Sequence, residues 1–515
     1  GGGAGRDRLA GRAAGRTFVP GMRSVSRVLA VWLTPAVMLA VPAALAARGP
    51  DGLWLGLLVV LVPLIALGVA GRRPAPAPED APGSGEALFP VLTLLLAVGV
   101  LLWANIALSG DLAAWLGARR WQGIVIAAAA GWLLTAWRPL RRLTPLLLAV
   151  AFAAAVMVLL QVVWALGLGP VAAWDRVASQ PAFRFPPSSP WVTAGRDLGA
   201  VRGGAPLVVD EVHRLTAPGG GVLRARTTDG ARASEMEWAL APGETVTLRA
   251  GDEIARGSRL RLRFEADKRV PGAPPSGMAW AEGRPPRWPE RMGLAVTLLA
   301  GAAALLRAGL SVRLSRDGAG FVAGGLLLAF VWAQAWAVYG LLQAPDLLLG
   351  GITPERLLEL PAPALFAEPW RRALQGLLLA AGLGAFLASS LALRERLGAL
   401  DATGGGEIGH DPGLWAGLFG GAALASLWPV DPWALTLLAL GGAGSALGPA
   451  ALWPPRRSRT ATTAGVVGLL VFAGFAVAQL RGASGDFLGA AVAYPALVAA
   501  PAGAVILWLG RRLTR

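Results

Sequence analysis

Long apolar segments without charge dominate this sequence. A helix needs about 20 apolar residues to cross the hydrocarbon layer of a bilayer, and stretches close to that length and free of Asp, Glu, Lys and Arg recur along the chain. Twelve are found, at about 28–47, 53–71, 87–109, 121–137, 143–168, 292–312, 319–343, 373–393, 413–428, 433–453, 460–480 and 487–509, and only the sixth contains a charged residue, Arg307 in its last turns. A lone segment in lipid satisfies its backbone hydrogen bonds only as a helix. The sequence therefore predicts a membrane all-α fold, a polytopic bundle of about 12 transmembrane helices.

The composition also indicates that lipid surrounds most of the chain. Of the 515 residues, 55% are apolar and 15% are charged, whereas about a quarter of a typical soluble protein is charged. The 47 Lys and Arg residues outnumber the 31 Asp and Glu residues, but most of the arginines form short clusters between apolar segments, where they contact lipid headgroups. No continuous basic face emerges, so we predict membrane lipids and no nucleic acid as partners. Lys268 is the single lysine, and this arginine bias is typical of GC-rich bacterial genes.

The N-terminal part divides at about residue 27. Residues 1–27 are rich in Gly, Ala and Arg without apolar periodicity, which predicts a disordered basic tail, with Met22 as a candidate start. Arg23 and Arg27 precede an apolar run that contains Ala44-Leu45-Ala46, as in a signal peptide. The run is longer than the 7–15 residues usual for signal peptides, so we predict an uncleaved first span. Residues 28–168 then hold helices 1–5, and residues 292–515 hold helices 6–12.

Arginine asymmetry sets the predicted orientation. With the N-terminus inside, the inner segments carry 22 arginines and the outer short loops carry seven, which are Arg48, Arg119, Arg120, Arg356, Arg371, Arg372 and Arg481. Positive residues concentrate on the cytoplasmic side of membrane proteins. We therefore predict a bacterial inner (plasma) membrane protein with both termini in the cytoplasm.

A different pattern occupies residues 175–291, which contain no membrane-length apolar run. Leu260, Leu262 and Phe264 alternate with charged residues, as in a strand with one wet face. Further strands are predicted near 206–212, 222–227, 235–240 and 245–248, separated by Gly- and Pro-containing turns. We predict an inserted extracytoplasmic all-β domain, sandwich-like or barrel-like, held by Pro-rich tethers at 181–190 and 271–289.

The sequence lacks the residues and motifs that several kinds of catalysis and metal binding require. The chain has no cysteine, which excludes disulfides and thiolate ligands. His213 and His410 are predicted to be solvent-facing loop residues on opposite sides of the membrane. Phosphate-binding glycine loops, nucleophile elbows and zinc-protease motifs are missing as well. We predict no cofactor and no metal site.

Polar groups inside the predicted spans are few. Asn105, Gln161 and Gln334 are amides that either line a solute path or bond a neighbouring helix. Pro35, Pro63 and Pro495 interrupt apolar segments, and such prolines kink helices or mark the broken helices used in substrate sites. Close helix approach is predicted at the glycine pairs 320/324, 417/421 and 444/448. Because carboxylates and histidines are missing at membrane depth, proton- or ion-coupled transport is disfavoured.

Acidic residues in the predicted outer loops are the weak catalytic candidates. They are Asp346, Glu355, Asp111 and Asp431. An acidic external loop after a seventh span, here 345–370 with Asp346 and Glu355, is similar in topology to cell-wall glycan polymerases of the SEDS type. The resemblance implies an enzyme or flippase that acts on lipid-linked glycans at the outer leaflet, with outer carboxylates as base or metal ligand.

Three functions follow from these patterns. The leading prediction is a multi-pass protein of the bacterial cell envelope, more a scaffold than an enzyme, whose 175–291 domain binds an envelope protein or a glycan. The alternatives are the lipid-linked glycan enzyme or flippase and a partner-driven transporter. Carboxylate dependence distinguishes the enzyme, and solute flux that depends on Asn105, Gln161 or Gln334 distinguishes the transporter.

Overall fold

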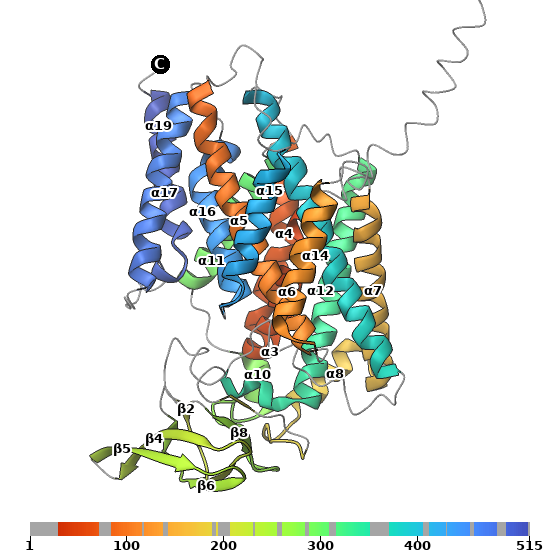
Figure 1. Ribbon diagram of the computed structural model, residues 1–515, viewed down its shortest axis with the longest axis vertical. Coiled ribbons are helices and arrows are strands. Elements are labelled where there is room, and N and C mark those ends of the chain that lie inside the picture. The colour runs from red at the N-terminus through yellow and green to blue at the C-terminus, as the bar shows by residue number, and fades with distance from the viewer. Residues whose placement is uncertain are drawn as a thin grey trace, which may run out of the picture.

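The computed structural model shows a helical bundle with a small strand region at one end (Figure 1). It describes residues 29–71, 84–115, 118–136, 143–187, 192–193, 207–229, 232–254, 260–283, 288–307, 316–350, 370–404, 411–428, 430–453, 458–480 and 491–512. The predicted tail at 1–27, Glu355 and His410 lie outside these residues.

Each of the twelve predicted apolar intervals contains a helix. They are α3 (Pro35–Arg48), α4 (Pro50–Gly71), α5 (Ser84–Trp115), α6 (Arg120–Ala136), α7 (Thr144–Leu166), α11 (Trp288–Arg307), α12 (Arg316–Gln343), α14 (Trp370–Gly404), α15 (Pro412–Ala425), α16 (Pro432–Leu452), α17 (Ser458–Leu480) and α19 (Ala496–Arg512). Among the described residues, five segments are long and apolar enough to cross a membrane, at Leu88–Ala114, Leu146–Trp164, Gly324–Gln343, Pro432–Leu452 and Arg459–Ala478. The helical membrane class is thus confirmed, and the number of crossings stays a prediction.

Small residues bring α11 and α16 together. A Cβ placed on Gly444 would lie 2.6 Å from the backbone nitrogen of Gly301, and one on Gly448 would lie 2.9 Å from the carbonyl oxygen of Ala300. The pair 444/448 therefore makes the close helix contact that its spacing predicts. Gly417 and Gly421 on α15 have nothing within 4 Å of the same position, so the prediction is wrong for that pair.

The strand region contains two four-stranded sheets. One has the order β1 (Val192–Thr193), β8 (Arg261–Phe264), β3 (His213–Ala217) and β6 (Glu244–Leu248). The other has the order β2 (Leu207–Val208), β7 (Glu253–Ile254), β4 (Gly221–Asp229) and β5 (Arg232–Leu240), and every pairing is antiparallel.

Alternation of side chains explains how the sheets bury a core. Leu215 and Ala217 on β3 are buried while Arg214 is exposed, and Leu262 and Phe264 on β8 are buried in the same way. The predicted strands at 222–227, 235–240 and 245–248 coincide with β4, β5 and β6. Strand β3 escaped prediction because its five residues include His213, Arg214 and Thr216, which hide the apolar alternation.

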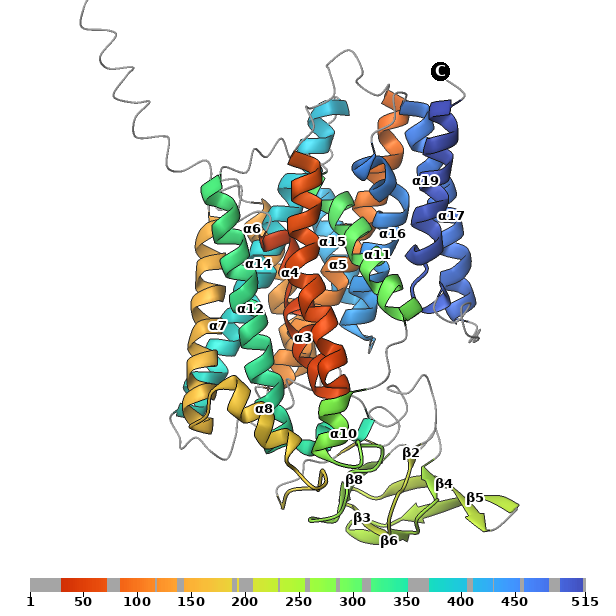
Figure 2. The same ribbon diagram turned by 180° about the vertical axis from the view of Figure 1, so that it is seen from behind.

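Two short helices join the strand region to the bundle. Helix α8 (Pro170–Ala178) follows α7, and α10 (Gly277–Glu282) follows the last strand and lies at the foot of α3 (Figure 2). The ring of Trp280 on α10 lies 4.5 Å from that of Trp174 on α8 between centroids, at a tilt of 45°. The Trp280 indole N–H donates to the carbonyl of Ala46 over 2.8 Å. Gly49 has φ +58°, and a Cβ there would lie 2.1 Å from the Trp280 carbonyl oxygen. The strand region is therefore fixed to the end of α3 and is not held by its proline-rich tethers alone.

Candidate functional site

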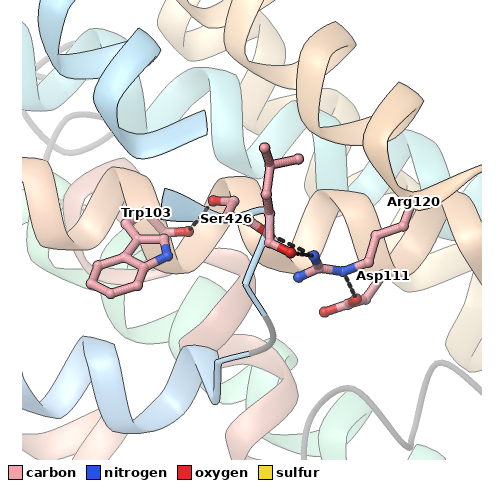
Figure 3. A network of polar contacts seen from close by, with 5 residues as sticks. Trp103, Asp111, Arg120 and Ser426 are labelled. Atoms are coloured by element: carbon pink, nitrogen blue, oxygen red, sulfur yellow. Dashed lines mark hydrogen bonds and ion pairs between the residues drawn. The ribbon is translucent and has the colours of Figure 1, made fainter. Parts of the chain in front are cut away.

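Asp111 forms an ion pair that ties three helices together (Figure 3). Nε of Arg120 donates to Oδ1 of Asp111 over 2.6 Å, which links α5 to α6. Nη1 of Arg120 donates to the carbonyl of Ser426 over 2.6 Å, one of the acceptors left free where α15 ends. The Ser426 hydroxyl also lies 3.3 Å from the carbonyl of Trp103. Asp111 thus holds a cation that fastens α15 to α5 and α6.

Asp431 caps the N-terminus of α16. Its Oδ1 accepts the backbone N–H of Trp433 over 2.8 Å, with Pro432 at the first helical position, an arrangement that stabilises helix starts. Burial raises the pKa of this carboxyl, while the N–H groups of Trp433 and Ala434 oppose the rise. The residue also has exposed surface, and its direct structural role is that of a helix cap.

Asp346 lies elsewhere in the bundle. It is buried, 4% exposed, on the short 3₁₀ helix η3 (Pro345–Gly350), which packs on α12. Among the described residues, no group of three or more His, Asp or Glu side chains is close enough to hold a metal ion. Asp111, Asp346 and Asp431 therefore lie on different elements and do not form a common site.

His213 is buried, contrary to the prediction of a solvent-facing loop residue. It is 0% exposed, and its ring meets Phe185 and Phe264 edge-on, with centroids 6.0 and 5.6 Å away. Neither ring nitrogen has a hydrogen-bond partner among the described residues. Burial lowers the pKa of His213, and Glu211, the next largest influence, opposes that change. A neutral histidine therefore completes an aromatic core, which rules out its use as an exposed ligand.

The first predicted span is broken inside the bundle. Residues 29–32 are helical, Leu33 and Thr34 leave the helix, and α3 starts again at Pro35. Thr34 caps the new helix, because its hydroxyl accepts the N–H of Val37 over 3.4 Å. At 1.5 Å per residue, the break lies about 21 Å along α3 from its end at Arg48. If Arg48 marks the membrane surface, as the predicted first span requires, this position falls inside a hydrocarbon layer about 30 Å thick. Irregular backbone at such depth occurs only where protein or an aqueous cavity surrounds it.

Prolines expose further backbone acceptors beside the break. Pro63 lies four residues after Val59 in α4 and has no N–H for the Val59 carbonyl, and the indole N–H of Trp32 donates to that carbonyl over 2.9 Å instead. Pro42 in α3 stands in the same relation to Met38. A polar group of the broken segment thus serves a carbonyl that a helix would normally satisfy itself.

A small cavity lies among these elements, between α3, α4 and α12. It is lined by Leu33, Val37, Met38, Val41, Gly56, Val59, Ala329 and Phe330. Its volume of ≈ 10 Å³ is at the lower limit for one water molecule, and the side chains that line it are apolar. The broken segment, the proline-affected carbonyls of Met38 and Val59 and the cavity together form the candidate site.

The sequence indicated part of this site. Pro35 and Pro63 were among the prolines expected to kink or break spans, and Pro35 does follow a break. Trp32 was missed, since its role depends on a carbonyl 27 positions away. Asn105 was expected to line a path or bond a neighbouring helix, but its Nδ2 donates to the Leu101 carbonyl of its own helix over 2.7 Å.

Comparison with known proteins gives one fold relationship. No family model and no curated protein matches the sequence. A solved structure, described as the substrate-bound outward-open state of a Na⁺-coupled sialic acid symporter, matches with a TM-score of 0.53 and 12% sequence identity, covering 96% of this chain and 91% of that chain. At this identity the likeness shows the fold alone. The chain is a multi-pass helical membrane protein whose bundle is similar in fold to that of a membrane transporter.

Proposed function

We propose that this chain is a membrane transport protein that moves a small polar solute through its helical bundle. The observation that carries the proposal is the break in the first helix at Leu33 and Thr34, buried at membrane depth beside a cavity. Transporters commonly build their substrate sites from discontinuous helices near the middle of the bilayer. The fold likeness to a symporter supports the same function.

The energy source is proposed to lie outside the chain. Among the described residues of the apolar helices, Arg394 is the charged side chain that is buried, 2% exposed, and no carboxylate or histidine accompanies the break. Proton-coupled transporters place such groups at membrane depth. Transport is therefore proposed to be passive or driven by a partner protein.

The finer topology belongs to this proposal. We place the twelve helices across a bacterial inner membrane, with both termini cytoplasmic and residues 175–291 outside as a sandwich-like domain. Arginine asymmetry supports this orientation. The strand region would then capture an envelope protein or a glycan, and its fixation to α3 through Trp280 would link capture to the bundle.

A non-transporting scaffold is the second candidate function. It is favoured by the smallness of the cavity beside the break, which admits no solute in this conformation. The lipid-linked glycan enzyme has less support, because Asp111 is engaged by Arg120 and Asp431 by the start of α16.

Flux through purified protein in liposomes tests transport. Iso-osmotic swelling with glycerol or xylitol, and uptake of sialic acid with and without a Na⁺ gradient, should show at least one flux well above that of protein-free vesicles. Asp111→Asn and Asp431→Asn would leave the chemistry of transport intact, whereas an enzyme would lose its activity with one of them. Absence of every flux, together with a cellular phenotype that depends only on residues 175–291, would establish the scaffold instead.

A further inference from the structure

Three aromatic side chains on α12 carry polar groups that the protein leaves without partners. The indole N–H of Trp332, the indole N–H of Trp336 and the hydroxyl of Tyr339 have no hydrogen-bond partner among the described residues. The three side chains are 3%, 3% and 1% exposed. Buried indole and phenol groups usually find a partner, so three exceptions on one helix are informative.

The three groups share one face of the helix. Their spacing of four and three residues places them on adjacent turns, and the rings of Trp336 and Tyr339 are 6.0 Å apart between centroids. Gly325 lies seven residues before Trp332 and so belongs to the same face. The Cβ position of Gly325 is 3.4 Å from Phe152 of α7 and 3.6 Å from Leu29 of the first helical segment. Helix α12 contacts both α7 and α3 (Figure 2), and the neighbours of Gly325 place the aromatic face toward α7 and the broken first span.

This face extends from the candidate site toward the end of the bundle that carries the strand region. Ala329, one turn before Trp332, lines the small cavity beside the helix break. Tyr339 lies about 6 Å and Trp332 about 16 Å from the end of α12 at Gln343, at 1.5 Å per residue. The three donors thus form a row from near the surface to the cavity.

The surroundings restrict the chemistry of a ligand. Helix α7, residues 35–47 of α3 and residues 318–343 of α12 contain no Asp, Glu, Lys, Arg or His. The charged residues on other elements that contact α12 include Asp346 on η3 and Asp175 and Arg176 on α8, which lie outside these apolar stretches. An ion without a countercharge is strongly disfavoured in such a place. Indole groups only donate, so the ligand must offer acceptor oxygens to a wall that is otherwise aromatic and apolar.

We infer that Trp332, Trp336 and Tyr339 form the binding wall of the solute path, and that the solute is neutral and rich in hydroxyl groups, such as a polyol or an uncharged sugar. The inference rests on the proposed transport function and assigns its substrate class. The helices are closed around the wall here, and alternating access requires that they separate during transport.

Ring-conserving substitutions test the wall without emptying the core. The triple variant Trp332→Phe/Trp336→Phe/Tyr339→Phe removes all three donors and retains an aromatic ring at each position. Removing unpaired buried donors is stabilising, whereas the smaller Phe rings at 332 and 336 leave cavities that are destabilising, so the variant is first shown to unfold cooperatively in detergent. Trp121→Phe/Trp164→Phe is the matched control, since those side chains are 50% and 71% exposed.

Xylitol serves as the probe in two measurements, swelling of proteoliposomes and the shift of the melting temperature in detergent. The wall predicts at least about a tenfold loss of xylitol flux in the triple variant alone. It also predicts that the melting-temperature shift in xylitol falls, in the triple variant alone, to the general polyol effect seen with a non-binding osmolyte. Undiminished flux in the triple variant overturns the wall and leaves transport standing. If xylitol stabilises the wild type only when the three donors are present, and no flux is seen, the binding wall stands and transport is refuted. If xylitol neither crosses nor stabilises the wild type, the wall is refuted.

Discussion

At the scale of single residues, burial decides what polar groups do in this chain. Arg120 is half-buried and meets a carboxylate and a helix end, whereas His213 is fully buried and meets two phenylalanine rings. The first arrangement holds a charge and the second is stable only while the side chain is neutral. Acid should therefore act on the strand region through His213.

The strand region should lose stability as the pH falls below about 6.5. Burial lowers the folded-state pKa of His213 from its ordinary value of 6.5, so the unfolded chain binds this proton at a higher pH than the folded chain. Stability is then complete above pH 6.5 and declines as the pH falls toward the folded-state pKa. Hydrogen exchange measures this loss of stability at the backbone amides of Phe185, Asp267 and Val270, which form hydrogen bonds between segments 183–185 and 267–270.

His213→Phe is the control for this pH dependence, because it retains a ring between Phe185 and Phe264 and cannot titrate. Its amide protection should stay level between pH 6.5 and 5. Glu211 and Asp210 before β3, with Glu265 and Lys268 after β8, are the other charges that act on this position. Equal pH slopes in the two proteins would assign the effect to those groups.

At the scale of elements, backbone acceptors and glycine contacts determine how helices fit. Pro63 has no N–H to donate to the carbonyl of Val59, and the indole N–H of Trp32 donates to that carbonyl instead. Gly444 and Gly448 let α16 touch α11 at backbone distance. Each relation predicts a specific response to substitution.

Trp32→Phe should destabilise the protein by about 1–3 kcal/mol, since it leaves the buried Val59 carbonyl unpaired. In a Pro63→Ala background the same change should cost less, because residue 63 then offers that carbonyl an N–H within α4. Melting temperatures of the four proteins in detergent form a double-mutant cycle. Additive effects would show that the carbonyl is not shared.

Gly444→Ala should be strongly destabilising, while Gly417→Ala should be neutral or stabilise the protein by up to about 1 kcal/mol, because alanine has the higher helix propensity. A side chain at 444 collides with the backbone of Gly301, and at 417 nothing lies within 4 Å. Thermal unfolding of the two variants, with Gly421→Ala as a second neutral control, checks the difference. Comparable losses at 444 and 417 would refute the α11–α16 contact.

At the scale of the whole molecule, the bundle, the broken span and the strand region act as one unit. Trp280 attaches the strand region to α3, the helix that follows the break. A ligand that bound the strand region, as proposed, would be connected to the candidate site through α10 and α3.

Cysteine labelling can establish the orientation, because the chain has no cysteine of its own. Thr247→Cys on β6 and Arg512→Cys at the end of α19 introduce exposed thiols at opposite ends of the molecule. In intact spheroplasts, a membrane-impermeant maleimide should label residue 247 and should label residue 512 only after lysis. The reverse pattern would invert the proposed topology.

The sequence alone determined where helices form, because an apolar run of about 20 residues has no other structure available in lipid. It also located β4, β5, β6 and β8, since side-chain alternation is local. Only the tertiary structure decided that Pro35 marks a break while Pro63 leaves α4 continuous, that Asp111 pairs with Arg120 and that His213 is buried. Those outcomes depend on which distant group faces each residue, and composition and periodicity carry no information about distant partners.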